Sequence, residues 1–136
     1  MILGIGVDAV DVRRFARVLD RTPGTRNRLF TNDELAYADS LSDPTPSLAA
    51  RFAVREAAMK ALGVGLGAVD FHDIAVRRHE SGRPTLLAGG RAARLAADLG
   101  VETWWVSMTH TDDLAVAYVI AEGPAAPLVA RPTMTP

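Results

Sequence analysis

Cysteine is absent from this 136-residue sequence, which excludes a disulfide framework and a thiol nucleophile. Lysine is almost absent, since 14 of the 15 basic residues are arginine and Lys60 is the single exception. No apolar run approaches the roughly 20 residues that a membrane-spanning helix needs. The apolar start at residues 2–7 has no basic stretch before it and no small-residue cleavage site soon after it. We therefore expect a cytoplasmic protein that is neither exported nor membrane-bound.

The net charge is also close to zero, because the sequence has 15 basic and 16 acidic residues. This balance gives no indication of nucleic acid or a membrane surface as a partner. Apolar residues make up 49% of the chain, enough for one ordinary domain to bury a core without a structural metal. We expect a single domain over residues 1–122. Residues 123–136, rich in proline and alanine, are expected to form an irregular tail without chemistry.

The first elements predicted are a strand over residues 2–7 and a helix that follows it. Apolar residues recur at helical spacing from Val10 to Leu19, before turn-forming residues at 22–24. Asp8 is therefore expected at the junction of the strand and the helix.

The rest of the pattern predicts further helices and two hairpins. The elements are a helix opened by the capping box of Thr31 and Glu34 and ending near Ser40, a helix over 48–62 closed by Gly63, strands over 74–78 and 84–87, a helix over 91–99, and strands over 101–109 and 115–121. The alternation of these elements predicts an α+β fold, in which a mainly antiparallel sheet packs against a long buried helix.

The helix over residues 48–62 carries most of the candidate chemistry. All its residues are apolar except Arg51, Arg55, Glu56 and Lys60. At about 100° per residue, the two arginines and the Glu56/Lys60 pair lie on different sides of the helix. Only one of these two charged stripes can easily face bulk water.

Glu56 and Lys60 share one face of this helix, four residues apart, and two interpretations stay open. The pair could be a common surface ion pair, worth only about 0.3–0.5 kcal/mol. Alternatively, a carboxylate on a buried helix needs a partner or a metal. Asp8, which follows the closely spaced Gly4 and Gly6, could join Glu56 as a ligand of Mg²⁺, although it could also simply cap the next helix. A single lysine among arginines could serve proton transfer, or could be a product of chance.

Two weaker signals concern anion binding. Gly63, Gly65 and Gly67 can bring backbone N–H groups close to a phosphate, although their spacing does not match a Walker loop. His110 ends a predicted strand at a turn, where it could bind a phosphate oxygen or have a structural role.

The order and spacing of these motifs resemble those of the acyl-carrier-protein synthase family of 4′-phosphopantetheinyl transferases. The motifs are GIGVD at residues 4–8 followed by Arg13 and Arg14, Phe30-Thr31 with Glu34, RFAVREA at 51–57 with Lys60-Ala61, and VSMTH at 106–110. The resemblance covers residues 2 to about 122, and the segment around Glu56 is its most specific part.

The resemblance implies a homotrimeric Mg²⁺ enzyme with sites between subunits, which moves phosphopantetheine from coenzyme A to a serine of a carrier protein. Asp8 and Glu56 match the metal ligands, Lys60 the catalytic lysine, and His110 a contact to the coenzyme A phosphates. Glu56 or a water on the metal would accept the serine proton, and Lys60 would stabilise or protonate the departing adenosine 3′,5′-bisphosphate. Arg55 stands where the family commonly has lysine, which leaves the phosphate contact of that position open.

Other candidate residues complete the expected site. The candidate contacts for coenzyme A are Arg51, Arg55, Gly63, Gly65, Arg83, Pro84, Thr109 and His110. The arginines of the first helix are either a docking surface for an acidic acyl carrier protein or an ordinary solvated face; they are Arg13, Arg14, Arg17 and Arg21. Rival functions are a Mg²⁺-dependent phosphohydrolase and a catalytically silent binding subunit. Whether the acceptor is a fatty-acid, polyketide or peptide carrier stays open.

Overall fold

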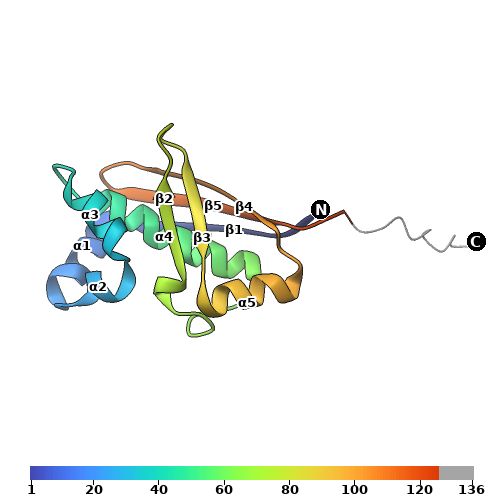
Figure 1. Cartoon of the computed structure of the whole chain (residues 1–136). Helices are drawn as coiled ribbons and strands as arrows, with labels where there is room; N and C mark the ends of the chain where they lie inside the picture. Colours follow the sequence, from blue (N-terminus) through green and yellow to red (C-terminus); the bar gives the residue numbers. More distant parts are fainter. Residues whose placement is uncertain (126–136) are drawn as a thin grey trace, which may run out of the picture.

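The computed structural model describes residues 1–125 of the chain (Figure 1). Its elements are β1 (Ile2–Asp11), α1 (Val12–Arg21), α2 (Thr25–Leu29), α3 (Asn32–Asp39), α4 (Thr45–Leu62), the 3₁₀ turn η1 (Phe71–Asp73), β2 (Ile74–Arg78), β3 (Pro84–Ala88), α5 (Gly90–Leu99), β4 (Thr103–His110) and β5 (Leu114–Glu122). Of the predicted tail at 123–136, residues 126–136 lie outside the described part.

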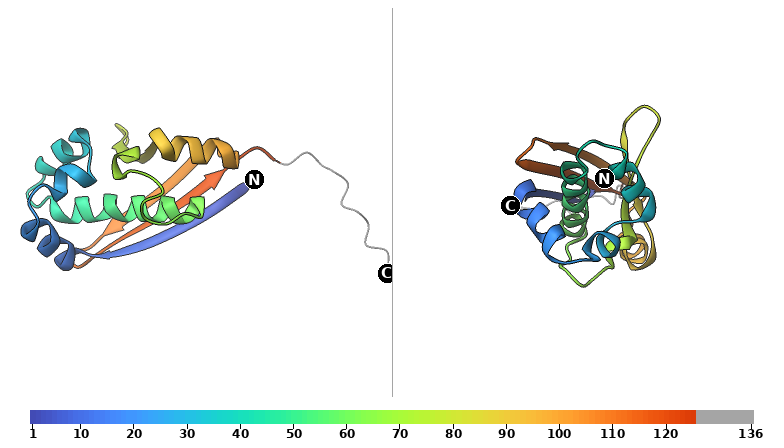
Figure 2. Two further views of the ribbon diagram at one scale, coloured as in Figure 1. Left: turned by 90° about the horizontal axis from the view of Figure 1, so that it is seen from below. Right: turned by 90° about the vertical axis from the view of Figure 1, so that its left-hand side faces the viewer.

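A three-stranded antiparallel sheet in the order β1-β5-β4 forms one layer of the fold, and β2 and β3 form a separate hairpin. Helix α4 lies along one face of the three-stranded sheet, and α1, α2 and α3 gather at one end of the molecule (Figure 2). The residues of β5 that face the core are small and buried, namely Ala115, Ala117, Val119 and Ala121. The α+β fold with antiparallel strands against a long helix is confirmed.

Two glycines bring β1 into direct contact with α4. A Cβ atom on Gly4 would lie 1.8 Å from the carbonyl oxygen of Ala61, and one on Gly6 would lie 1.8 Å from that of Ala57. No side chain fits at either position without moving backbone atoms, so glycine is required there. The close approach brings Asp8, two residues after Gly6, beside the middle of α4.

The two arginines of α4 form its buried charged stripe. Arg55 is 0% exposed, and its Nη1 donates to Oε2 of Glu34 at 3.0 Å while Nη2 donates to Oε1. Glu34 belongs to the predicted capping box with Thr31, which is confirmed, and its Oε2 also accepts from the N–H of Val76 at 3.1 Å. One carboxylate thus joins α3, α4 and β2, and the Glu56/Lys60 side of α4 is the more exposed one.

Several boundaries differ from the sequence prediction. β1 continues to Asp11 because residues 9–11 pair with β5. Asp11 then caps α1, accepting from the N–H of Arg14 at 2.9 Å, so the interpretation of Asp8 as a helix cap was wrong. α4 begins at Thr45, inside the predicted loop, with Pro46 in its first turn, where proline is tolerated. The short helix α2 was not predicted.

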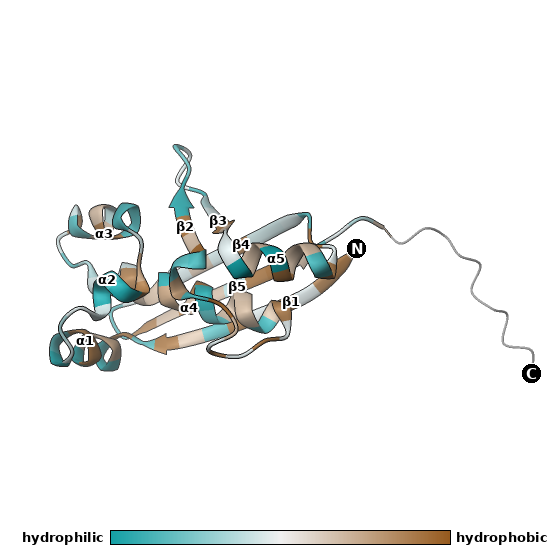
Figure 3. Ribbon diagram, turned by 60° about the horizontal axis from the view of Figure 1, so that its bottom comes forward, coloured by the Kyte–Doolittle hydropathy of each residue, from teal (hydrophilic) through white to brown (hydrophobic). Residues whose placement is uncertain are grey.

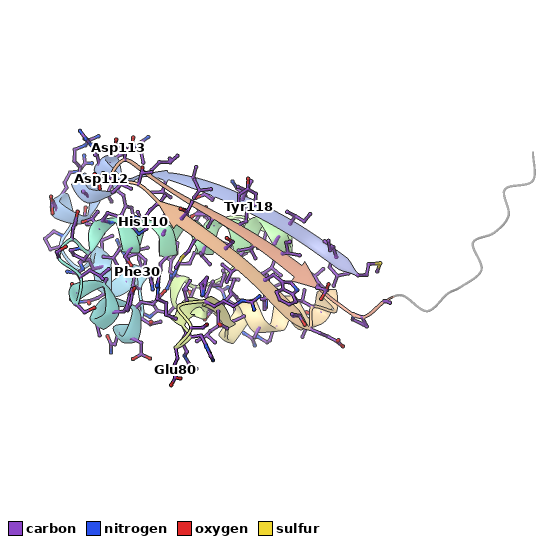
Figure 4. All side chains as sticks on the ribbon, turned by 90° about the horizontal axis from the view of Figure 1, so that it is seen from above. Phe30, Glu80, His110, Asp112, Asp113 and Tyr118 are labelled. Carbon is purple, nitrogen blue, oxygen red and sulfur yellow. The ribbon has the colours of Figure 1, made fainter. Side chains whose placement is uncertain are left out.

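The face of the sheet turned away from α4 is apolar and exposed. Ile5 of β1 is 60% exposed and Tyr118 of β5 is 56% exposed; Val7, Trp105 and Leu114 are also exposed. Figure 4 looks onto this face and labels Tyr118. We call it the outer sheet face, with residues Ile5, Val7, Trp105, Leu114 and Tyr118.

The hydropathy of the helices agrees with their burial. Most of α4 is apolar along its length, whereas α1 and α5 alternate polar and apolar residues (Figure 3). Across residues 1–125, none of the helices combines the length and apolar character that crossing a bilayer requires.

Candidate active site

A shallow pocket of about 440 Å³ lies between β1, α1 and α4. Asp8, Asp11 and Glu56 supply its carboxylates, of which Asp11 already accepts from the N–H of Arg14 as the cap of α1. Arg14 also lines the pocket. The rest of its lining is mainly apolar and includes Val10, Phe15, Val18 and Phe52. The pocket therefore combines three acidic groups with an apolar wall, and sequence reasoning had not identified that wall.

Lys60 reaches from α4 to β1 at this pocket. Its Nζ donates to the carbonyl oxygen of Val7 at 2.8 Å and lies 3.3 Å from Oδ1 of Asp8. The Lys60 side chain is 55% exposed and that of Asp8 is 19% exposed. Among the described residues, the ion pair of Lys60 is therefore with Asp8 and not with Glu56, four residues before it on α4.

The pKa of Glu56 is raised above its ordinary value, first by burial and then by the charge of Asp8. The charge of Lys60 opposes this rise. The two carboxylates are thus close enough to repel each other, with one ammonium beside them. A cation that binds both carboxylates would relieve this repulsion.

The donor set of this pocket fits Mg²⁺. In the part of the chain that the structure describes, no three side chains of the types His, Asp and Glu gather into a metal cluster. Mg²⁺ is usually held by one or two carboxylates, and waters and substrate phosphates complete its shell. Asp8 and Glu56 supply such a pair, and Asp8 is not engaged as a helix cap.

A second pocket, of about 250 Å³, lies between α3, α4 and the end of β4. Arg51, Thr109 and His110 line it, as do Tyr37 and Arg78, which carry no recognisable motif in the sequence. The Arg51 guanidinium lies 4.7 Å from the centre of the Tyr37 ring, and Arg78 lies 5.4 Å from it. Two guanidinium groups and a histidine make this pocket suitable for an anion.

Arg51 is buried yet not fully bonded. Its Nη1 donates to Oγ of Ser47 at 2.6 Å, whereas its Nε has no hydrogen-bond partner among the described residues. Burial lowers the pKa of Arg51, and the charge of Glu34 opposes that effect. An unsatisfied buried donor is costly, so a ligand that accepts from Nε would stabilise this pocket.

Arg83 and Pro84 line a third pocket, of about 370 Å³, between the β2–β3 hairpin and β4. Trp104 and Trp105 form part of its wall, and the Arg83 guanidinium lies 5.6 Å from the centre of the Trp105 ring. A guanidinium beside aromatic rings suits a flat, charged ligand such as a nucleotide.

Two of the expected contacts to coenzyme A, Arg55 and Gly63, have surroundings that do not favour that role. The guanidinium of Arg55 is buried in the core and bonded to Glu34 and to the carbonyl oxygen of Phe71. Gly63 is the C-cap of α4, with φ 72°, and its N–H donates to the carbonyl oxygen of Lys60. Gly65 is exposed in the following loop. The polar groups of Arg55 and Gly63 are therefore engaged within the fold.

The arginines of α1 are exposed beside the carboxylate pocket. Arg13 pairs with Asp113 at 2.7 Å, while Arg14, Arg17 and Arg21 point from exposed positions. His110, in contrast, lies at the end of β4, on the other side of the central strand β5 from Asp8 (Figure 4). Within one chain, the structure joins Asp8, Glu56 and Lys60 but does not bring His110 into their pocket.

Comparisons with known proteins agree with this architecture. Residues 4–119 match the family described as the 4′-phosphopantetheinyl transferase superfamily. A holo-[acyl-carrier-protein] synthase of Clavibacter sepedonicus is 49% identical over 93% of this chain and all of its own length, and one of Streptomyces griseus is 45% identical over 90% of this chain and all of its own length.

Solved structures give the same result. The crystal structure of holo-[acyl-carrier-protein] synthase from Neisseria meningitidis has a TM-score of 0.81 at 33% identity, over 90% of this chain and 99% of that one. The enzyme from Bacillus anthracis, in complex with CoA (3′,5′-ADP), has a TM-score of 0.76 at 33% identity, over 91% of this chain and 99% of that one. The chain is therefore a transferase that belongs to the 4′-phosphopantetheinyl transferase superfamily.

Proposed function

We propose that this enzyme transfers 4′-phosphopantetheine from coenzyme A to a serine of an apo acyl carrier protein, with Mg²⁺, and releases adenosine 3′,5′-bisphosphate. The observation that carries the proposal is that Asp8 and Glu56 line one pocket while Lys60 pairs with Asp8 and its charge acts on Glu56. The names of the relatives support the acceptor, and the neighbour from Bacillus anthracis, solved with CoA (3′,5′-ADP), supports the donor.

The chain's own residues supply the chemistry of the transfer. The serine oxygen forms a bond to the β-phosphorus, and the bond from that phosphorus to the leaving oxygen breaks. Glu56, or a water on the metal, would accept the serine proton. Lys60 neutralises or protonates the leaving bisphosphate. Mg²⁺ held by Asp8 and Glu56 would neutralise negative charge on the pyrophosphate.

The nucleotide end of coenzyme A is proposed to occupy the pockets on either side of β4. Arg51, Thr109 and His110 would receive a phosphate, and Arg83 and Pro84 would contact the nucleotide. Within one chain these pockets lie across the sheet from Asp8. One coenzyme A molecule would therefore bind between two subunits, with its phosphates on one and its reacting pyrophosphate on the other.

The outer sheet face supports the proposed homotrimer. It presents Ile5, Val7, Trp105 and Tyr118 on one side of the sheet, all at least partly exposed. Contiguous apolar surface of this kind on a water-exposed sheet marks an interface between proteins. Its burial between copies of this chain would also bring the pockets of neighbouring subunits together.

Helix α1 is the proposed docking surface for the carrier protein. Its exposed Arg14 lines the pocket that holds Asp8 and Glu56, and Arg17 and Arg21 are exposed on the same helix. An acidic carrier helix placed there would bring its serine to the carboxylates, and its attraction to the arginines would raise the association rate at low salt.

The function is tested by the mass of an apo carrier protein after incubation with enzyme, coenzyme A and Mg²⁺. We expect a gain of one phosphopantetheine, which excess chelator abolishes. Asp8→Asn and Glu56→Gln should lose nearly all transfer while keeping the circular dichroism spectrum, and Asp98→Asn, an exposed carboxylate on α5, is the matched control. Full transfer in chelator would refute the metal requirement.

The rival functions give different products in the same assay. A phosphohydrolase would release adenosine 3′,5′-bisphosphate without any carrier protein. A silent binding subunit would bind coenzyme A, as calorimetry would show, without changing the mass of the carrier. The intact set of Asp8, Glu56 and Lys60 favours the transferase over the silent subunit.

A further inference from the structure

We infer that Lys60 acts as an internal cation at the metal site: its ammonium occupies Asp8 until coenzyme A arrives, which makes metal binding depend on coenzyme A. The inference rests on the proposed function, because it takes Asp8 and Glu56 as the metal ligands. It goes beyond that function by giving Lys60 a role before any chemistry takes place.

The contacts of Lys60 carry the first step. Its Nζ lies 3.3 Å from Oδ1 of Asp8 and donates to the carbonyl oxygen of Val7 at 2.8 Å. The ammonium thus neutralises a carboxylate that a divalent cation would need. A singly and a doubly charged cation at one carboxylate repel each other, so the presence of one weakens the binding of the other.

The position of Lys60 is set by the fold. Because Gly6 has no side chain, the turn of α4 that contains Ala57 packs directly against β1. Lys60 lies on the next turn of α4. Its side chain is therefore long enough to bring its ammonium to β1. A Glu56–Lys60 surface pair would have left Asp8 free, whereas the observed pairing leaves Glu56 without an ion pair among the described residues.

The contact is also easy to break, as a replaceable cation requires. The Lys60 side chain is 55% exposed, and an exposed ion pair contributes little to stability. The pyrophosphate of coenzyme A offers the ammonium a more highly charged partner than one carboxylate. It also brings oxygen ligands that two carboxylates alone do not provide. Coenzyme A would therefore draw Lys60 from Asp8 and complete the metal's shell in one event.

The consequence is positive coupling between the two ligands. Coenzyme A tightens metal binding, and by thermodynamic linkage the metal tightens coenzyme A binding by the same factor. Without coenzyme A, the two carboxylates bind metal weakly because Lys60 competes for one of them. The enzyme would then hold metal mainly when its substrate is present.

The test measures Mn²⁺ binding by electron paramagnetic resonance, with and without coenzyme A, in the wild type, Lys60→Met and Lys60→Arg. Without coenzyme A, we expect Lys60→Met to bind Mn²⁺ about tenfold more tightly than the wild type, which corresponds to about 1.4 kcal/mol. Lys60→Arg keeps the charge and should stay within about threefold of the wild type. With saturating coenzyme A, the three proteins should differ by less than about threefold, because the site no longer depends on the ammonium.

Arg14→Gln is the matched control, because Arg14 lines the same pocket but has no ion pair with Asp8 or Glu56 among the described residues. It should change the Mn²⁺ affinity by less than about twofold. Equal tightening by Arg14→Gln and Lys60→Met would overturn the inference, since a general loss of positive charge would then explain both. Unchanged or weaker Mn²⁺ binding by Lys60→Met would also overturn it.

Asp8→Asn separates this inference from the proposed function. If Asp8→Asn weakens Mn²⁺ binding but Lys60→Met does not strengthen it, the metal site stands and only the role of Lys60 fails. If Asp8→Asn leaves Mn²⁺ binding unchanged, the proposed metal site itself is wrong, and the inference fails with it.

Discussion

Arg55→Met tests the buried ion pair that joins α4 to α3 and β2. The substitution removes the partner of Glu34 and leaves a carboxylate in the core. Breaking a buried pair in this way typically costs about 3–5 kcal/mol. Glu34 would keep its hydrogen bonds from the N–H groups of Thr31 and Val76, at 3.0 and 3.1 Å. We therefore expect a loss at the lower end of that range. For a domain of this size, about 3 kcal/mol lowers Tm by roughly 10–15 °C.

The loss of stability caused by Arg55→Met should depend on pH in a defined direction. Burial raises the pKa of Glu34, but the hydrogen bond and charge of Arg55 and the N–H groups of Thr31 and Val76 outweigh it, so the net pKa lies below its ordinary 4.5. A carboxyl with a lowered folded-state pKa stabilises the fold above its unfolded-state pKa, and this stabilisation is lost as the pH falls through the folded value. The difference between the wild type and Arg55→Met should therefore be full near neutral pH and shrink below about pH 4.5.

Urea unfolding at neutral and acidic pH, followed by tryptophan fluorescence, measures this difference. Arg94→Met on α5 is the matched control, because Arg94 is exposed and has no ion pair among the described residues, and it should change stability by less than about 0.5 kcal/mol. A loss below about 1 kcal/mol for Arg55→Met, or a loss that stays constant as the pH falls, would refute the reasoning.

Three further predictions concern the glycine contact, the outer sheet face and the lysine. Gly6→Ala should destabilise the protein by about 1–3 kcal/mol in urea unfolding, because its Cβ would overlap the Ala57 carbonyl. Gly65→Ala is the control, because its Cβ would meet open space and the free energy of unfolding should barely change. Equal losses of stability in the two variants would contradict this account. Tyr118→Lys should yield monomers in light scattering, whereas an unchanged assembly would exclude the outer sheet face as the interface. Lys60→Arg should lose at least about tenfold in single-turnover transfer with a smaller change in coenzyme A affinity, and transfer close to that of the wild type would leave Lys60 a purely electrostatic contact.

Local patterns in the sequence predicted the local structure well. The capping box of Thr31 and Glu34 and the C-cap Gly63 are present as predicted, because both depend on residues close in sequence. The end of β1 was predicted four residues too early, at residue 7 in place of Asp11. Pairing with β5 extends the strand to Asp11, and no feature of residues 8–11 alone reveals a partner so distant in sequence.

The site was predictable in its residues but not in its pairings. The sequence showed that α4 carries two charged stripes and that only one can easily face water. Which stripe is buried depends on Glu34, which α3 places against Arg55. Likewise, the helix spacing indicated a Glu56–Lys60 pair, whereas the close approach of β1 gives Lys60 the nearer partner Asp8. Non-local contacts decided both cases.

The position of β5 at the centre of the sheet has a consequence for how the chain folds. β5 pairs with β1 on one side and β4 on the other. β1, the first strand to be synthesised, therefore cannot pair until β5, the last strand, has been synthesised. At roughly 5–20 residues per second, the ~100 residues between them delay this pairing by about 5–20 seconds during synthesis. Throughout that time both edges of β1 are unpaired, whereas in the folded chain one of them pairs with β5. We expect the nascent chain to be the most aggregation-prone form of this protein, and its folding to be limited by the closing of the β1–β5 pair.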